Sequence, residues 1–280
     1  MKITLAQLNY IVGDFEYNLS KIIEAIKKAK NEKSDLIIFT ELAVCGYPPL
    51  DLLENKEFIE KCVNSINKII GESEEIGIII GTPWPNNKNN IKKLLNAAIF
   101  IYQKKIQKII SKTLLPDNDY FNEYHYFDSN LDFYIIEFKN KKFGITICED
   151  LWLQQTLICE RKNQKIYDVS PIEELISQNP DFIINISASP FTYMQNEIRK
   201  SIINNVIKKY KIPIIYVNQV GANTDLIFDG NSFVSDSNAT IRLKLPAFEE
   251  NITTFDLNEV LKNDLNNKCN YVDFNEEYRI

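Results

Sequence analysis

A strand-helix-strand unit at the start of the chain constrains its fold more than any other feature. Apolar runs predict strands at residues 3–8 and 36–39. Between them the sequence predicts a helix from Phe15 to about Glu32, capped by Asp14, with one apolar face (Leu19, Ile22, Ile23, Ile26 and Ala29). Two strands joined through a helix lie parallel in one sheet, with a right-handed crossover. The pattern therefore predicts an α/β fold.

Strands and helices keep alternating over most of the 280 residues, and no linker-like segment divides them. Loops are expected at residues 81–87 and 116–128, and Ser170-Pro-Ile-Glu173 has the pattern of a capping box. We expect one domain over residues 1–270, with helices covering two stacked sheets. The remaining elements are predicted as helices at 54–70, 170–179 and 195–210, strands at 76–80, 94–102, 106–110, 132–138, 142–147, 182–186 and 214–217, and β-structure over 228–255.

Composition excludes several functional classes. The net charge of -6 and the lack of a basic stripe argue against a nucleic-acid-binding protein. No apolar run is long enough for a membrane span, and Met1 leads directly into a strand without a signal peptide. The cysteines are odd in number and lack paired metal-ligand spacing, so we interpret them as thiols of a cytoplasmic protein (Cys45, Cys62, Cys148, Cys159 and Cys269).

Three predicted strands end in a chemically reactive side chain. Glu41, Lys112 and Cys148 each follow an apolar strand directly, and Cys148 is followed by Glu149 and Asp150. Each has an alternative explanation, because a glutamate can cap a helix, a lysine can end a strand in solvent, and a free cysteine is often buried. Strand ends in open α/β sheets tend to form ligand sites. We therefore expect the three side chains to meet.

Together these residue types suit acyl transfer by a cysteine nucleophile. A thiol needs a base to remove its proton, and the carboxylate of Glu41 can serve. A tetrahedral intermediate needs donors for its oxyanion, which Lys112 and the backbone N–H of Glu149 can supply. Spacing alone leaves open whether this is a catalytic site.

Five further stretches of the chain form a recognisable set: Phe39-Thr-Glu-Leu-Ala-Val-Cys-Gly-Tyr-Pro-Pro49, Lys112-Thr-Leu-Leu-Pro116, Ile147-Cys-Glu-Asp-Leu-Trp152, Asn185-Ile-Ser-Ala-Ser-Pro-Phe191 and Asn218-Gln-Val-Gly-Ala222 with Phe228-Asp-Gly230. They resemble the nitrilase, or carbon-nitrogen hydrolase, superfamily, and within it the amino-terminal glutaminase domains of glutamine-dependent NAD+ synthetases. The resemblance implies a four-layer α-β-β-α sandwich and cysteine-dependent amide hydrolysis of L-glutamine. It also implies that Glu41, Lys112 and Cys148 form the catalytic triad, with Glu123 as a second, supporting glutamate.

The expected substrate-binding residues match the family only in part. Ser189 matches its substrate-contacting serine, and Glu149 is a further candidate. Asn118 stands where a tyrosine usually helps to bind glutamine, His125 where an arginine is usual, and Gln195 where a lysine or arginine usually meets the substrate carboxylate. These departures leave the substrate less defined than the chemistry.

Arg199 is a candidate replacement for the cation that is absent at Gln195. It lies four residues further along the predicted helix 195–210, so it shares a face with Gln195 one turn away. Its forked guanidinium can bind a carboxylate in two places. The alternative is that Arg199 pairs with Glu197 or Asp181, or lies in solvent.

The resemblance also implies partners. Amide hydrolysis of this type needs no metal or organic cofactor, whereas ATP and deamido-NAD+ would belong to a synthetase domain, and residues 271–280 resemble the start of a linker to it. The sequence has no Gly-rich phosphate loop of its own. A homo-oligomer is also implied, with residues 152–166 as the candidate surface, unless that segment covers its own sheet.

Three alternative functions remain open from the sequence. The first is an amidase of the same superfamily that acts on another small amide. The second is a catalytically weak domain that docks a synthetase partner. The third is a cysteine-histidine hydrolase, which would have to use His125, the only histidine. We expect His125 instead to pack or hydrogen-bond within its tyrosine-rich loop.

Overall fold

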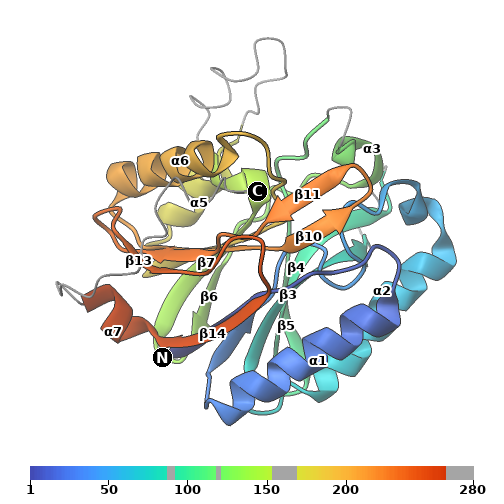
Figure 1. Cartoon of the computed structure of the whole chain (residues 1–280), viewed down its shortest axis with the longest axis horizontal. Helices are drawn as coiled ribbons and strands as arrows, with labels where there is room; N and C mark the ends of the chain where they lie inside the picture. Colours follow the sequence, from blue (N-terminus) through green and yellow to red (C-terminus); the bar gives the residue numbers. More distant parts are fainter. Residues whose placement is uncertain (87–91, 118–120, 153–168, 263–280) are drawn as a thin grey trace.

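The computed structural model describes residues 1–86, 92–117, 121–152 and 169–262 (Figure 1). Two six-stranded sheets stack on one another, and helices cover their outer faces, which confirms the predicted α-β-β-α sandwich. Helices α1 (Phe15–Asn31) and α2 (Lys56–Gly71) cover one sheet, and α5 (Pro171–Ile176) and α6 (Gln195–Tyr210) cover the other. The expected linker at 271–280 and nearly all of the expected oligomer surface lie outside the described residues.

The first sheet contains the predicted parallel unit. Its strand order is β14-β1-β2-β3-β4-β5, with β1, β2 and β3 parallel and the other pairs antiparallel. The Asp14 carboxylate accepts a hydrogen bond from the Tyr17 N–H at 3.0 Å and so caps α1, as expected. The strands are β1 (Lys2–Gln7), β2 (Leu36–Ile38), β3 (Gly77–Pro85), β4 (Leu94–Tyr102), β5 (Lys105–Ser111) and β14 (Asn251–Asp256).

The second sheet repeats this arrangement, with β7, β8 and β9 parallel at its centre and the order β13-β12-β9-β8-β7-β6. A separate hairpin, β10 (Val220–Asn223) with β11 (Leu226–Asp229), lies beside the sheets. The strands of the sheet are β6 (Ile135–Phe138), β7 (Lys141–Ile147), β8 (Phe182–Ser187), β9 (Ile214–Asn218), β12 (Phe233–Ser235) and β13 (Ile241–Lys244).

Apolar side chains from both sheets fill the space between them. Ile38 points into this inter-sheet core, whereas its neighbour Ile37 packs under the helices, as the two-residue period of a strand requires. The Phe100 ring meets those of Phe138 and Phe143 edge-on, with centroids 5.5 and 6.2 Å apart. The core therefore fixes how the two sheets lie relative to each other.

Strand β3 is longer than predicted, because residues 81–85 pair with β4 and do not form a loop. The Gly81 N–H donates to the Thr40 carbonyl at 3.1 Å. Because side chains and backbone groups alternate along a strand, the nitrogens of Pro83 and Pro85 point to the same side of β3 as the Gly81 nitrogen. On that side β2 has already ended, so no backbone N–H is needed there for pairing. Tertiary pairing overrides the local turn signal here.

Three other local predictions were wrong. Ser170 precedes α5 but its side chain makes no capping hydrogen bond, and the helix ends at Ile176, earlier than residue 179. The expected loop at 116–128 contains a short helix, α3 (Glu123–Tyr126). The chain also forms α7 (Leu257–Lys262) beyond the β-rich segment, where no element was predicted. These are short elements whose formation depends on tertiary contacts.

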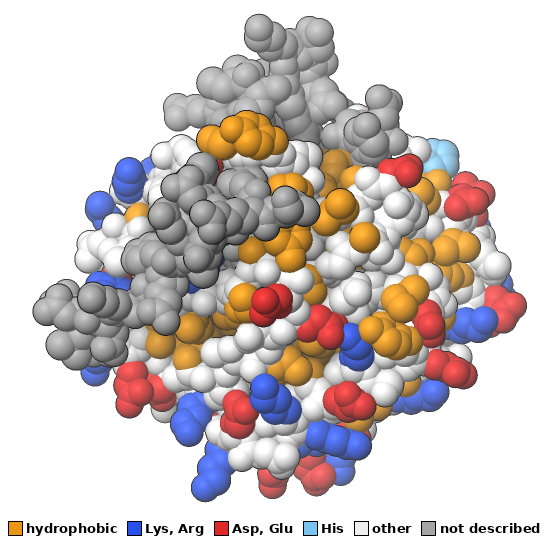
Figure 2. Space-filling view, viewed as in Figure 1, with side chains coloured by type: hydrophobic (Ala, Val, Ile, Leu, Met, Phe, Trp, Pro, Cys, Tyr) orange, Lys and Arg blue, Asp and Glu red, His pale blue; other side chains and the backbone are white. Residues whose placement is uncertain are grey.

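On the face seen in Figure 2, acidic and basic side chains are interspersed over the part of the surface near α1 and α2 and form no single-sign patch there.

Among the described residues, no helix combines the length and the apolar character that crossing a membrane would require.

Candidate active site

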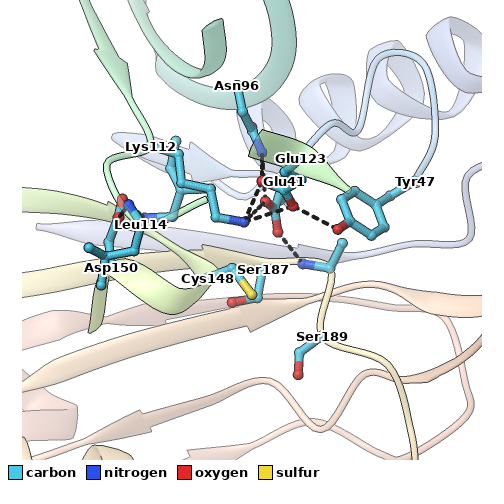
Figure 3. Close-up of polar contacts among 12 residues, drawn as sticks. Glu41, Tyr47, Asn96, Lys112, Leu114, Glu123, Cys148, Asp150, Ser187 and Ser189 are labelled. Carbon is cyan, nitrogen blue, oxygen red and sulfur yellow. Dashed lines mark hydrogen bonds and ion pairs between the residues drawn. The ribbon is translucent and has the colours of Figure 1, made fainter. Parts of the chain in front are cut away.

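The sandwich brings Glu41, Lys112 and Cys148 together from two different sheets (Figure 3). Glu41 follows β2 and Lys112 follows β5, both in the first sheet, whereas Cys148 follows β7 in the second. A cavity of about 550 Å³ opens beside them, and Lys112, Glu123 and Cys148 are among its lining residues. The predicted meeting of the three strand ends is therefore present.

The Lys112 ammonium is held between two buried carboxylates. Its Nζ lies 2.8 Å from Glu41 Oε1 and 2.8 Å from Glu123 Oε2. The side chains of Lys112, Glu41 and Glu123 are 1%, 0% and 3% exposed, so water screens these charges little. Burial alone would lower the pKa of Lys112, but the two carboxylates outweigh it and raise that pKa well above its usual value. The lysine therefore acts as a fixed cation.

Two residues that the sequence did not reveal complete this cluster. Asn96 on β4 donates from Nδ2 to Glu41 Oε1 at 2.8 Å and to Glu123 Oε2 at 3.2 Å. The Tyr47 hydroxyl donates to Glu123 Oε1 at 2.7 Å. The only signal for Asn96 was a single amide side chain inside an otherwise apolar strand.

Glu123 and Glu41 differ in their surroundings. Burial is the main cause that raises the pKa of Glu123 to about 7, with Lys112 opposing the shift and Glu41 adding to it. Glu41 Oε2 accepts the backbone N–H of Ala188 at 2.9 Å, and Ala188 follows β8 of the second sheet. Glu41 thus links the two sheets next to the cysteine.

The Cys148 thiol lies below Lys112 and Glu41 in the view of Figure 3. Burial and then the Glu41 carboxylate raise the pKa of this thiol well above its ordinary value, although Lys112 opposes them. The resting thiol is therefore protonated and needs a base before it can attack. The backbone at Cys148 has a φ of +48°, a left-handed conformation that is rare for residues with a side chain.

Side chains from the next strand hold this turn in place. Asn185 on β8 donates from Nδ2 to the Cys148 carbonyl at 3.2 Å and to Thr146 Oγ1 at 2.9 Å. Ser187 Oγ in turn donates to Asn185 Oδ1 at 2.7 Å. The strained conformation at the cysteine is thus maintained by a chain of hydrogen bonds.

Four of the predicted substrate-binding residues line the same cavity, namely Glu149, Ser189, Gln195 and Arg199. The backbone of Ser189 is fixed by Asn218, whose Oδ1 accepts its N–H at 2.8 Å and whose Nδ2 donates to its carbonyl at 3.1 Å. The fifth predicted residue, Asn118, lies outside the described residues.

Arg199 is paired, but with neither of the two partners that the alternative interpretation named. Its two terminal nitrogens donate to the carboxylate oxygens of Asp229 at 2.9 and 3.1 Å, and one also reaches the Pro190 carbonyl at 3.3 Å. Glu197 binds Lys200 instead, and Asp181 accepts the N–H of Lys142. The alternative pairings with Glu197 and Asp181 were wrong because β11 places Asp229, 30 residues further along the chain, against α6.

His125 lies in a different part of the molecule. It lines a second cavity together with Glu54, whose carboxylate is 3.6 Å from Nε2, and its ring meets that of Tyr126 edge-on. Its side chain is 59% exposed, and it is not among the residues that line the Cys148 cavity. The geometry thus gives no support to a cysteine-histidine dyad.

Comparison with known proteins supports the assignment of the fold. The model of the carbon-nitrogen hydrolase family matches residues 2–263. A glutamine-dependent NAD(+) synthetase from Synechocystis sp. is 40% identical over 254 residues, and one from Thermotoga maritima is 32% identical over 258. The alignments cover 89% and 92% of this chain but 45% and 42% of those proteins. The chain thus spans less than half the length of these relatives.

Solved structures give the same result. A glutamine-dependent NAD+ synthetase from Acinetobacter baumannii, in complex with ADP, superposes with a TM-score of 0.81 and 30% identity, covering 93% of this chain and 46% of that one. An amidase from Nesterenkonia sp. superposes with a TM-score of 0.78 and covers 92% of this chain and 90% of that one. At 16% identity, the amidase establishes likeness of fold alone.

Proposed function

Since this chain belongs to the carbon-nitrogen hydrolase family, we propose that it is a cysteine-dependent amide hydrolase, the glutaminase part of a glutamine-dependent NAD+ synthetase. The observation that carries the proposal is the buried Lys112 ammonium, held by Glu41 and Glu123 beside the Cys148 thiol. A cation, a carboxylate base and a thiol are the groups that amide hydrolysis through a thioester requires. Similarity to glutamine-dependent NAD(+) synthetases supports glutamine as the substrate.

In the first half of the proposed reaction Glu41 takes the proton of the Cys148 thiol. The thiolate sulfur then attacks the carbon of the side-chain amide of glutamine. Lys112 and the backbone N–H of Glu149 stabilise the negative oxygen of the tetrahedral intermediate. The proton passes from Glu41 to the amide nitrogen, the carbon-nitrogen bond breaks, ammonia leaves and a thioester remains.

In the second half a water molecule replaces the ammonia. Glu41 removes a proton from this water, and the resulting hydroxide attacks the thioester carbon. The carbon-sulfur bond breaks, glutamate leaves, and the proton returns to the Cys148 sulfur. Glu123 does not exchange protons in this scheme; its carboxyl group, fixed by Tyr47 and Asn96, holds Lys112 in place.

For substrate binding we propose that Ser189, Gln195 and the Glu149 side chain contact the amino acid part of glutamine, since all three line the cavity. Because both terminal nitrogens of Arg199 are bound, we assign Arg199 to holding Asp229 and the Pro190 carbonyl. It would thus support the loop that carries Ser189. Asn118 remains a proposed contact.

A second candidate is an amidase that acts on a small amide without a carboxylate. It is favoured by the uncharged Gln195 and by the pairing of Arg199 with Asp229, because a buried carboxylate needs a charged partner or several donors. The test is a substrate panel of glutamine, asparagine and small aliphatic amides, with Cys148→Ala as the control. Turnover of aliphatic amides without glutamine would replace glutaminase by this candidate, and full activity of Cys148→Ala would refute both.

The proposal also concerns partners. The ammonia would be used by a synthetase region that binds ATP and deamido-NAD+, in the part of the longer relatives that this chain does not span.

We propose that the protein acts in the cytoplasm, which fits the free thiols of Cys45, Cys62 and Cys148. We also propose self-association through residues 152–166, which light scattering at micromolar concentration tests; a monomer there would refute it.

A further inference from the structure

We propose that Asp150 is a positioning residue, which holds the Lys112 strand end and the Cys148 turn in a fixed relation across the two sheets. The inference rests on the proposed amide hydrolysis, because it concerns the placement of two of its groups. Asp150 lies in the short 3-10 turn after β7, two residues beyond the cysteine, and it is only 3% exposed. It does not touch the reacting atoms.

The Asp150 carboxylate accepts three backbone hydrogen bonds. Its Oδ1 accepts the N–H groups of Thr113 at 2.9 Å and Leu114 at 2.8 Å, the two residues after Lys112 (Figure 3). Its Oδ2 accepts the N–H of Ile147 at 3.3 Å, the residue before Cys148. One side chain therefore binds the segments that carry both the cation and the nucleophile.

A purely local role does not account for this arrangement. To close its own turn, Asp150 needs only the bond to Ile147, and that is the longest of the three. The two shorter bonds reach the end of β5, which belongs to the other sheet. Burial also desolvates the carboxylate, which raises the pKa of Asp150 to about 7 against the effect of its backbone donors and of Lys112.

The chemistry explains why such a link matters. No backbone ladder joins β5 to β7, so apolar packing and a few polar links set the distance between Lys112 and Cys148. The hydrogen bond from the Ala188 N–H to Glu41 provides another such link beside the cysteine. Catalytic groups must be held to within a fraction of an ångström, and a shift of about 1 Å can lower the rate about 100-fold.

Asp150→Asn is the first test, because asparagine has the same shape but a different set of donors. Its oxygen can accept the bonds from Thr113 and Leu114 only if its NH2 group faces the Ile147 N–H, donor against donor. Asp236→Asn is the control: Asp236 is also buried, and its Oδ1 accepts the N–H groups of Asn238 and Thr240 at 2.8 and 2.9 Å. Its Oδ2 pairs with Arg242, and Asp236 is not among the residues that line the cavity.

For Asp150→Asn we expect kcat for glutamine to fall about 10- to 100-fold while KM changes less than about threefold. Alkylation of the Cys148 peptide by iodoacetamide, followed by mass spectrometry, should slow in parallel. Asp236→Asn should lose comparable stability in urea but keep its kcat and its alkylation rate. An unchanged kcat and alkylation rate in folded Asp150→Asn would overturn the proposal, as would an equal loss of kcat in Asp236→Asn.

Asp150→Glu is the second variant, for the case that asparagine prevents folding. It keeps the charge, but its extra methylene pushes the Lys112 strand end away from Cys148, so kcat should again fall with KM little changed. Wild-type kcat in Asp150→Glu would overturn the proposal. Because alkylation needs no glutamine, the result is readable even if the unmodified chain prefers another amide.

Discussion

The Lys112 ammonium lies between two buried carboxylates, those of Glu41 and Glu123, so one positive charge faces two acidic groups. Lys112→Met removes the proposed oxyanion donor and should lower kcat about 100- to 1,000-fold. It also leaves two buried carboxylates without their cation, so the unfolding free energy should fall by about 3 kcal/mol at neutral pH. This is the low end of the loss expected when a buried ion pair is broken, because Glu123 can take up a proton and so lose its charge.

The control for this variant is Lys209→Met, which removes a lysine from a half-exposed pair with Glu173. Such pairs contribute little, so both kcat and the urea midpoint should stay close to those of the unmodified chain. If Lys112→Met kept its stability and lost only activity, the buried ion cluster would not hold the fold in the way that we infer.

The pKa of Glu123, about 7 in the folded chain against an ordinary value of 4.5, predicts a pH dependence of stability. Between these values the folded chain binds more protons than the unfolded chain, so the unfolding free energy falls as the pH rises through this window, by up to about 3 kcal/mol from this group. Glu123→Gln cannot titrate. Urea unfolding at pH 5 and pH 7 should therefore show a smaller decrease in the variant, and equal decreases would contradict the assignment.

At the residue scale, the sequence predicted the groups that end strands but not those that support them. The positions of Glu41, Lys112 and Cys148 follow from apolar runs that stop at a polar side chain. Asn96 contacts both carboxylates from inside a strand, and Asp229 binds Arg199 across 30 residues. Nothing in the local sequence encodes which distant side chain a buried polar group will meet.

At the scale of elements, the backbone of strand β3 packs closely against the turn that carries Glu41. A Cβ atom at Gly81 would lie 2.4 Å from the Leu42 nitrogen and 2.7 Å from the Glu41 Cα. These are backbone atoms, so Gly81→Ala must displace the turn. We expect kcat to fall at least about 10-fold and the unfolding free energy to fall by about 1–3 kcal/mol.

Gly71→Ala is the matched control for this substitution, since a Cβ there meets nothing within 4 Å. Gly71 is the last residue of α2, where alanine is the better helix former, so stability should stay the same or rise by up to about 1 kcal/mol. Kinetics and urea unfolding of the two variants measure both effects. A Gly81→Ala variant with wild-type kcat would show that the turn can move without disturbing Glu41.

Elements were predicted well where hydrophobic periodicity was long and poorly where the signal was a short motif. Helix α6 runs from Gln195 to Tyr210, as its pattern predicted. The Ser170 motif failed because the buried Ser170 hydroxyl makes no capping bond, so α5 lacks the predicted cap. Strand β3 continues past Pro83 because its partner β4 supplies the pairing. Tertiary pairing decided the case of β3, whereas nothing in the structure explains the missing cap at Ser170.

At the scale of the whole molecule, the site exists only where the two sheets meet. Each sheet supplies part of the proposed machinery: the proposed base and the cation come from one sheet, and the proposed nucleophile from the other. The inter-sheet core, with Phe100 packed against Phe138 and Phe143, therefore determines the geometry of the reaction as well as stability. The longer relatives also contain a region that this chain does not span.

Because the site lies entirely within residues of this chain, we can predict what the 280-residue chain does by itself. Glutamine hydrolysis through Cys148 needs no nucleotide, so the chain should release ammonia and glutamate in equal amounts whether or not ATP and deamido-NAD+ are present. Its sequence has no Gly-rich loop to bind phosphates, so no NAD+ should form, even when ammonium is supplied directly. Coupled assays for glutamate and NAD+ on one sample measure both products. Formation of NAD+ would mean that this chain binds and activates a dinucleotide itself, and glutamine hydrolysis that required ATP would mean that the site is assembled only in a larger protein.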